Sequence, residues 1–441
     1  MTTRRMICAV LVLAVACCGG IAFAEPAFKV GVSERARHEY WKDIFDYNAD
    51  VLDNRNFFRF KTSLWLNADM NDDLKAFVKF TNENRAYTYW GVNATGNKDF
   101  HYDINELVFD NLYVDINNIL GMPFDLRIGR QDFLGTYGEG FLIMDGTPQD
   151  GSRTFYFNAV KGAWRIDDAN VLDFIYINNP RDDIFLPVLN EDKAPQNLNT
   201  TDEVAYILYW KNKGIKDLLL ESYYMYKRED DDGGRGLQGQ KGYINTLGSF
   251  AKYAFAPWTL RGQCAYQFGT YGTNDRRAIG GYVYLDRSFK DVKFKPVASV
   301  GFSYLSGDKR KTTKNEAWNP LFSRWPWISE LYVLSMGTET GVLGYWTNMQ
   351  VWSASLVLAT SPKTKLSLWH HFLRAPEQIA ATTVFSSSGK DRGHLPQARF
   401  DYAINKNVST YVLAEYMVPG NFYVNNRDSA LFLRTEVQIK F

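Results

Sequence analysis

Apolar and polar residues alternate with a period of two along most of this chain. In residues 58–67, every second position is apolar or threonine, and the positions between them are polar or tryptophan. Such alternation predicts β-strands that have one apolar face and one hydrated face. In a soluble sandwich the apolar face covers a protein core. In a membrane barrel it contacts lipid, and the hydrated face lines the lumen.

About 18 segments show this alternation, at the length expected of strands that cross a membrane. They span residues 28–40, 55–68, 74–85, 105–117, 123–131, 154–167, 170–179, 201–211, 217–228, 242–255, 257–269, 277–289, 293–305, 349–360, 364–374, 393–404, 408–417 and 430–441.

The connections between these segments alternate in length. The short ones are 69–73, 118–122, 167–169, 212–216, 256–257, 290–292, 361–363 and 405–407. The long ones are 41–54, 86–104, 132–153, 180–200, 229–241, 270–276, 306–348, 375–392 and 419–429. Outer-membrane barrels combine short periplasmic turns with long extracellular loops, whereas a sandwich has no reason to alternate. The sequence therefore predicts an all-β, antiparallel transmembrane barrel of about 18 strands.

Two further features favour an outer-membrane barrel. No run of 18 apolar residues follows the first 24 residues, which excludes a helical membrane protein and leaves a closed barrel as the structure that can span lipid. The last strand ends in Phe441 and keeps its alternation, which resembles the closing strand that the outer-membrane insertion machinery recognises. We predict one domain, residues 25–441.

The first 24 residues have the composition of a cleaved signal peptide. Arg4 and Arg5 precede an apolar stretch, residues 6–21, and Ala22-Phe23-Ala24 is a typical cleavage site. We predict that the mature chain starts at Glu25. A membrane anchor is the alternative, but the apolar stretch is short and ends in a cleavage site.

Charge and cysteine content narrow the function classes. The chain has 50 basic and 49 acidic residues, and this near neutrality argues against a nucleic-acid partner. Cys8, Cys17 and Cys18 lie in the signal, so only Cys264 remains and the mature chain can form no internal disulfide. A lipoprotein that begins at Cys17 or Cys18 is a rival interpretation, but the residues before them lack the usual leucine.

Basic residues predominate among the positions that the alternation assigns to the lumen. They are Lys29, Arg35, Arg37, Arg59, Lys61, Lys75, Lys79, Arg85, Arg127, Lys161, Arg165, Arg399, Arg434 and Lys440. The acids assigned to the same faces are Glu39, Glu83, Asp115, Asp125, Asp401 and Glu436. A cationic lumen concentrates anions, and arginine also binds carboxylates with two parallel hydrogen bonds. The alternative is that these charges only hydrate the interior and pair across strands.

Several segments together resemble the alginate-export family of outer-membrane barrels. They are Leu-Arg-Ile-Gly-Arg-Gln-Asp-Phe at 126–133, Gly-Glu-Gly-Phe-Leu-Ile at 138–143, Asp-Gly-Thr-Pro at 145–148, Gly-Ser-Arg-Thr-Phe at 151–155, Tyr-Leu-Ser-Gly-Asp at 304–308 and Asn-Pro-Leu-Phe at 319–322, with similar stretches at 35–40 and 55–60. The resemblance implies an eighteen-stranded monomeric barrel with an arginine-rich pore that passes an anionic polysaccharide.

The resemblance also implies particular residues. Arg127, Arg130 and Arg153 match the basic motif positions of the family. Arg130 shares its parity with Ile128, so placing it in the lumen requires a bulge or a strand end. The loop after the fifth strand, 132–153, is expected to fold into the pore. Its acids are Asp132, Glu139, Asp145 and Asp150.

Catalytic and metal-binding signatures are missing from the sequence. His370 and His371 are adjacent on a predicted strand, so they point to opposite faces and cannot share a metal. The acidic tip at 229–234 lacks the ligand spacing of a calcium loop and is interpreted as a solvated loop. No zinc-protease, serine-hydrolase or haem-attachment motif occurs. We predict no cofactor, no metal and no enzymatic activity.

The combined interpretation is a passive, integral channel of the Gram-negative outer membrane with a cationic lumen, passing an anionic polysaccharide or oligosaccharide. Lipid and lipopolysaccharide surround it, and periplasmic export proteins are possible partners. One alternative is a general or anion-selective uptake porin for small solutes. The other is a barrel enzyme with catalytic residues near the rim.

Overall fold

The computed structural model describes residues 26–51, 54–87, 107–144, 157–187, 189, 199, 201–230, 241–424 and 427–441. It contains eighteen strands, which are β1 (Ala27–Lys42), β2 (Arg55–Asp69), β3 (Leu74–Tyr87), β4 (Leu107–Ile116), β5 (Phe124–Gln131), β6 (Phe157–Arg165), β7 (Asn170–Asn179), β8 (Asp202–Asn212), β9 (Leu218–Asp230), β10 (Lys241–Phe255), β11 (Trp258–Tyr271), β12 (Asn274–Ser288), β13 (Val297–Leu305), β14 (Met349–Leu358), β15 (Thr364–Arg374), β16 (Asp391–Ala403), β17 (Val408–Pro419) and β18 (Ala430–Lys440). Each predicted segment overlaps one of these strands, and the ends differ by no more than four residues.

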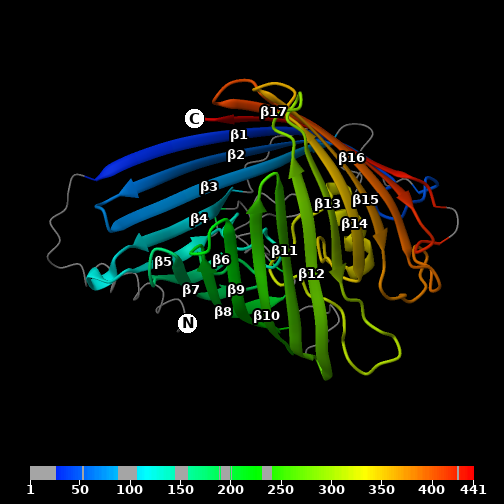
Figure 1. The fold of residues 1–441 in the computed structure, drawn as a ribbon, viewed down its shortest axis with the longest axis horizontal. Coiled ribbons are helices and arrows are strands. Elements are labelled where there is room, and N and C mark those ends of the chain that lie inside the picture. Colours follow the sequence, from blue (N-terminus) through cyan, green and yellow to red (C-terminus); the bar gives the residue numbers. More distant parts are fainter. Residues whose placement is uncertain are drawn as a thin grey trace.

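The strands form one closed, antiparallel ring. Every strand pairs with its neighbours in sequence, and β1 pairs with β18 as well as with β2 (Figure 1). Backbone hydrogen bonds between Val32 and Phe441, of 3.1 and 2.9 Å, extend the closing ladder to the end of the chain. The predicted fold class is confirmed. Closure leaves no unpaired strand edge, which is the condition for a sheet that spans lipid.

The two faces of the wall differ in the way that the alternation predicts. Large apolar side chains point outward and stay exposed, among them Val30 at 69% and Leu64 at 50%. The inward positions between them bear charged side chains that are buried, such as Arg59 at 1% exposure and Glu39 at 0%. A soluble protein has the opposite distribution, so the exposed apolar band is the surface that contacts lipid.

Most connections have the predicted lengths, with two exceptions. The connection predicted at 270–276 is a tight turn, because β11 extends to Tyr271 and β12 begins at Asn274. Gly272, with a φ of 58°, supplies the left-handed residue of this turn. The connection predicted at 290–292 is longer than predicted, because β13 begins only at Val297. Turn-forming residues near the ends of strands make the strand boundaries hard to predict from sequence, because backbone pairing can continue where the apolar–polar alternation has ended.

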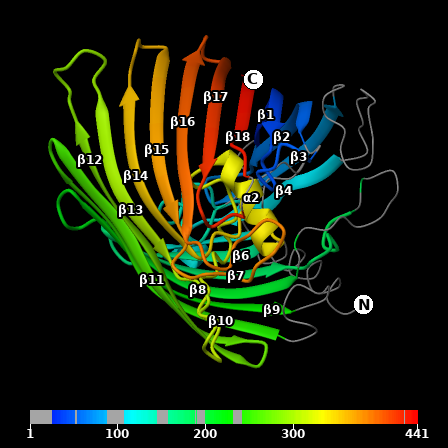
Figure 2. The same cartoon turned by 90° about the vertical axis from the view of Figure 1, so that its right-hand side faces the viewer.

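A helix lies inside the barrel and was not predicted. The connection between β13 and β14 contains α2 (Glu330–Thr340), which Figure 2 shows within the ring of strands. The side chain of Ser329 accepts a hydrogen bond from the Tyr332 backbone amide and caps the start of α2. Gly341 ends it in the left-handed conformation, with a φ of 73°. A second, short 3-10 turn, η1 (Ile119–Gly121), connects β4 to β5.

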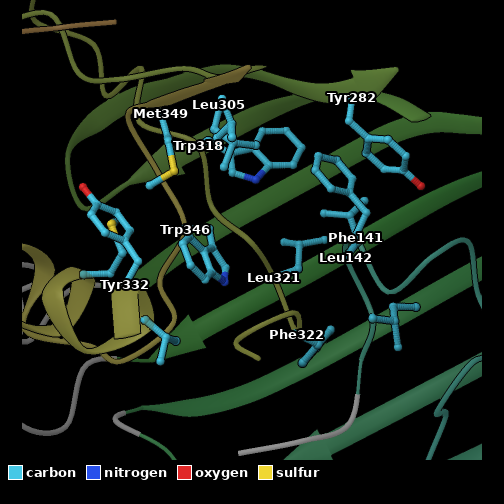
Figure 3. Packing of buried hydrophobic residues seen from close by; sticks show 14 of the residues in the cluster. Phe141, Leu142, Tyr282, Leu305, Trp318, Leu321, Phe322, Tyr332, Trp346 and Met349 are labelled. Atoms are coloured by element: carbon cyan, nitrogen blue, oxygen red, sulfur yellow. The ribbon is translucent and has the colours of Figure 1, made fainter. Parts of the chain in front are cut away.

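The buried apolar residues lie inside the barrel, not between layers of sheet. Figure 3 shows Phe141, Trp318, Phe322 and Tyr332 converging in front of the inner wall, from two connections that are far apart in sequence. Among the described residues, no helix is long and apolar enough to cross a membrane. Helix α2 and the labelled residues of the cluster belong to connections that lie inside the ring of strands.

Candidate conduit through the barrel

The connection after β5 enters the lumen and lies against the inner wall. Its described part contacts β7 and β9: the Tyr137 hydroxyl donates to Asp173 at 2.8 Å, and the Gly138 amide donates to Glu221 at 2.8 Å. The Lys211 ammonium lies 4.3 Å from the centre of the Tyr137 ring. Burial and the neighbouring Asp173 carboxylate raise the pKa of Tyr137 well above its usual value, so its hydroxyl remains a donor.

A second connection, between β13 and β14, meets the first inside the barrel. The Phe322 amide donates to the Leu142 carbonyl at 3.0 Å, and the Trp325 indole donates to the Gly140 carbonyl at 3.0 Å. The ring of Phe141 stacks on that of Trp318, with centroids 5.4 Å apart. We call residues 133–144 and 306–348 the two lumenal segments. Because each covers backbone and rings of the other, they act as one unit that narrows the lumen.

The C-terminal half of helix α2 is held against the side of the barrel opposite to β7 and β9. Arg392 of β16 is fully buried and donates two hydrogen bonds, of 2.6 and 2.9 Å, to the Glu339 carboxylate. The same guanidinium donates to the Tyr332 hydroxyl at 3.0 Å and lies over the ring of Phe422. Burial raises the pKa of Tyr332. A bidentate pair in a site without water is a strong and specific contact, so it fixes this end of the helix.

The N-terminal end of α2 is fixed by two other strands. Glu415 of β17 accepts hydrogen bonds from the Ser329 hydroxyl at 2.6 Å and from the Leu331 amide at 2.7 Å. A carboxylate at this position satisfies amides that the helix leaves unpaired. Glu330 pairs with Arg434 of β18 at 2.5 Å. Charged groups of three neighbouring strands, β16, β17 and β18, thus fix the helix to one side of the lumen.

A network of charged side chains continues from this helix along the wall. Arg434 also donates to Glu39 at 2.7 Å, Glu39 accepts from Arg59 at 3.2 Å, and Arg59 donates to Glu83 at 2.5 Å. Arg35 donates to the other oxygen of Glu83 at 2.8 Å. These groups are almost completely buried, and their mutual pairing compensates for the water that they lose.

A cavity of about 640 Å³ lies between the lumenal segments and the wall. Its lining combines aromatic rings with charged groups: Trp327, Trp369, Tyr284, Arg261, Arg399 and Glu415. The size is typical of a site for a small organic molecule. Most of its lining residues come from β11 to β17, and the others come from the two lumenal segments.

Comparison with known proteins decides the family. The model of the alginate export family matches residues 27–435. The chain belongs to this family. A search of curated proteins gives no significant match.

Solved structures with a similar fold are outer-membrane channels. They include OccK8 (OprE) of Pseudomonas aeruginosa, with a TM-score of 0.59 and 10% identity over 96% of this chain and 99% of that chain. A BenF-like porin from Pseudomonas fluorescens Pf-5 gives a TM-score of 0.58 and 9% identity over 95% and 100%. OccK2 (OpdF) of Pseudomonas aeruginosa, in complex with glucuronate, gives 0.56 and 10% over 96% and 99%. At this identity the likeness concerns the fold. Family and fold together identify an integral outer-membrane barrel of the porin type.

In this alginate-export barrel, most of the sequence-predicted basic residues lie at inward positions of the ladder. Arg37, Arg59 and Arg85 face one another across β1, β2 and β3. Many of the predicted basic residues, Arg37 among them, pair with carboxylates of the same wall. These pairs are Arg37 with Glu436, Lys79 with Asp110, Arg127 with Asp115, Arg165 with Asp125, Arg399 with Asp401, and Arg434 with Glu39. Lys61 lies opposite Arg35 and Glu83 in the register.

Arg130 has the backbone parity of the outer face, but its side chain is only 2% exposed. It is opposite Leu112 and Asn158 in a regular register, and so it shares the outward parity of Ile128. Its guanidinium donates to both carboxylate oxygens of Asp183, at 3.0 and 2.5 Å. No bulge shifts it inward, because the pairing of β5 is continuous on both sides. Its place in the lumen remains a prediction, because Arg130 is the last residue but one of β5 and its side chain is buried there by its partners.

The predicted constriction loop is described only in part. Asp132 is exposed, and Glu139 pairs with Arg261 and accepts from the Tyr282 hydroxyl at 3.2 Å. Asp145, Asp150 and Arg153 lie outside the described residues.

Sequence reasoning missed many of the inward-facing charges. The acids that it left out are Asp110, Asp173, Glu203, Glu221, Asp286 and Glu415, and the bases are Lys211, Lys227, Lys252, Arg261, Arg276 and Lys365. Most could have been found by extending the alternation through every predicted strand, but Asp110 stands at the register shift between β3 and β4 and has the opposite parity to Asp115. Glu139, Glu330 and Glu339 project from the lumenal segments, and no periodicity predicts them. The additional acids reduce the cation excess that the first count suggested.

His370 and His371 lie on opposite faces of β15, as the alternation predicts. His371 points inward and lies 2.8 Å from the Ser353 hydroxyl, whereas His370 points outward toward His394. Within the described part of the chain, no group of three metal-ligating side chains occurs. At the acidic tip, Asp230 pairs with Arg228 and Lys241, and residues 231–234 lie outside the described ranges.

Proposed function

We propose that this outer-membrane channel passes an anionic polysaccharide or oligosaccharide through a basic lumen. The observation that carries the proposal is the row formed by Arg37, Arg59 and Arg85 on the inner wall. Like charges at facing positions of an antiparallel sheet are unfavourable for folding. Carboxylates of the wall pair with Arg37 and Arg59 and offset this cost, and the row still presents an exposed guanidinium, that of Arg85, to an anion that travels along the wall.

The carboxylates of the wall suit such a passage. Arg59 and Arg35 already pair with Glu83, so a passing carboxylate competes with a resident one. Competition keeps binding weak at each position, and conduction requires sites that are weak and numerous. Arginine can exchange one planar partner for another with little reorganisation. One chain closes one barrel, so a monomer contains a complete conduit.

Removing one exposed charge of the row tests the proposal. Arg85→Gln is expected to shift the reversal potential in a salt gradient toward the cation value, because Arg85 is the exposed member of the row. Planar-bilayer recordings measure this shift. Arg374→Gln is the matched control, since Arg374 is an exposed arginine at an outward position of β15. Cation selectivity of the wild-type channel contradicts the proposal.

A second candidate is a porin for small anionic solutes. It is favoured by the lumenal segments, which are held by numerous contacts and leave cavities of small-molecule size. One protein of similar fold has been solved with glucuronate. Comparing the block of the current by a polymer with the block by its monomer distinguishes the two candidates. Block of the current by long polyuronates at concentrations where monomeric uronate has no effect supports the polymer conduit. Equal effects at equal uronate concentration support the small-solute porin.

A further inference from the structure

The outer face of the wall changes from apolar to basic where β11, β12 and β13 reach the end of the barrel with the short connections. Leu260, Leu285 and Val300 lie side by side in the ladder of these three strands and belong to the apolar band. Arg287 follows two positions after Leu285, so it shares the outward face, and it is exposed. Because short connections of such barrels lie on the periplasmic side, Arg287 is at the boundary between the periplasmic leaflet and water.

Two aromatic rings flank the Arg287 guanidinium. Its central carbon lies 4.9 Å from the centre of the Trp258 ring, directly opposite on β11, and 4.7 Å from the centre of the Phe289 ring. The Lys293 ammonium lies 4.9 Å from the centre of the Phe294 ring in the adjoining turn. Attraction to a ring face uses none of the N–H groups of a cation, so these groups can still donate to an anion. We call these five residues the rim cluster.

The turn that bears half of the rim cluster has a fixed backbone. The Phe289 amide donates to the Pro296 carbonyl at 2.9 Å, and the Phe294 carbonyl accepts from the Ala359 amide of the next connection at 2.8 Å. Phe294 and Lys295 have φ values of 66° and 42°, in the left-handed region that side chains disfavour. Such a conformation persists only where the surrounding contacts impose it, so the turn holds its rings and ammonium groups in one arrangement.

Positive charge is in excess in this part of the rim. Residues 287–295 contain four basic residues and one acid, all exposed: Arg287, Lys290, Lys293, Lys295 and Asp291. Among the described residues, none of these four basic side chains forms an ion pair. The connection between β2 and β3, at the same end of the barrel, contains Asp72 and Asp73 instead. The excess is therefore a property of this sector and not of the whole rim.

We infer that the rim cluster binds the headgroup of an anionic glycerophospholipid from the periplasmic leaflet, with Arg287 and Lys293 on its phosphate. The outward face selects a lipid over a dissolved anion, because acyl chains can lie on Leu260 and Val300 while the phosphate reaches Arg287. A zwitterionic headgroup brings its own ammonium and leaves the positive excess unmatched, whereas a net anionic headgroup reduces it. The wall separates this site from the lumen, so the site is independent of what the channel conducts.

Native mass spectrometry of the full chain in detergent tests this site. The probes are phosphatidylglycerol and phosphatidylethanolamine with identical acyl chains, and the wild-type protein is expected to retain phosphatidylglycerol preferentially. Arg287→Gln should weaken its binding about fivefold, as expected for one basic residue near an anionic lipid surface. Adding Lys293→Gln should weaken it further. Arg287→Lys keeps the charge and should retain most of the binding.

Arg277→Gln is the matched control for Arg287→Gln. Arg277 is an exposed arginine on the same face of the same strand, at the opposite end of β12, so its variant should bind phosphatidylglycerol like the wild type. Unaltered gel mobility shows that the barrel is folded in each variant. Equal retention of the two lipids by the wild-type protein overturns the inference without any variant. Displacement of the lipid by an equal concentration of glycerol 3-phosphate also overturns it, because the site then binds dissolved phosphates. Unchanged lipid preference in the double variant overturns the roles of Arg287 and Lys293.

Discussion

Replacing Glu339 with alanine is expected to raise the single-channel conductance and to make the current fluctuate between levels. The substitution leaves Arg392 fully buried without its carboxylate. Breaking a buried pair in this way costs about 3–5 kcal/mol. The barrel wall does not depend on this pair, so the cost is met by local detachment of α2. A helix that leaves the wall changes the width of the lumen, and bilayer recordings report the change directly.

A surface pair on the same connection provides the control for Glu339. Lys309 pairs with Glu316 at 3.1 Å, but the lysine is more than half exposed. Lys309→Ala should have little effect on stability and leave the conductance unchanged, since water and salt screen exposed pairs. If Glu339→Ala conducts like the wild type, with steady current, α2 does not limit the lumen and its charged anchors have only a structural role.

Replacing Trp318 with alanine is also expected to raise the conductance, in this case by weakening the contact between the two lumenal segments. The Trp318 side chain is 1% exposed and stacks on Phe141 of the other lumenal segment. Truncating a large buried aromatic side chain costs about 3–5 kcal/mol, because the cavity left behind does not collapse fully. The two segments should then separate more readily. We expect a higher conductance, and faster proteolysis within residues 133–144 or 306–348 of the folded barrel.

An enlarging substitution on the wall should reproduce the Trp318 phenotype. A Cβ atom on Gly280 would lie 2.6 Å from the Trp318 ring, so Gly280→Val displaces the indole without removing it. Trp318→Phe, which keeps an aromatic ring, should give a weaker effect than alanine. Intact gel mobility of the folded barrel shows that the wall survives in each variant. A wild-type conductance in both Trp318→Ala and Gly280→Val contradicts the assignment of these segments to the constriction.

The two lumenal segments also restrict which solutes the channel can carry. Their contacts include a bidentate ion pair, a capping carboxylate and a cluster of stacked rings. A polymer that passes this point must either follow the space beside α2 or displace the helix. The Glu339→Ala variant distinguishes these routes, since polyuronate block should weaken only if the attached helix forms part of the polymer path.

The sequence alone was sufficient to predict the wall. Strand positions, the closed antiparallel ring and the inward basic residues follow from period-two alternation, because lipid accepts only apolar side chains and a closed ladder. Alternation is a local property, so Arg59 or Arg434 can be assigned a face without knowledge of the partner strand. The same rule gives Arg130 the parity of Ile128, which the register of β5 repeats, while its predicted role in the pore remains untested.

Only the tertiary structure decided what fills the lumen. The partners of Arg392 and Arg434 are Glu339 and Glu330, which are 53 and 104 residues away in the chain. Helix α2 is buried on most sides by the wall and by aromatic residues of its own segment, so its sequence has no amphipathic period that would distinguish it from a loop. Such contacts exist only after eighteen strands have closed and brought distant connections into one enclosed space. The width of the passage is therefore a consequence of closure, and no single segment of the sequence contains it.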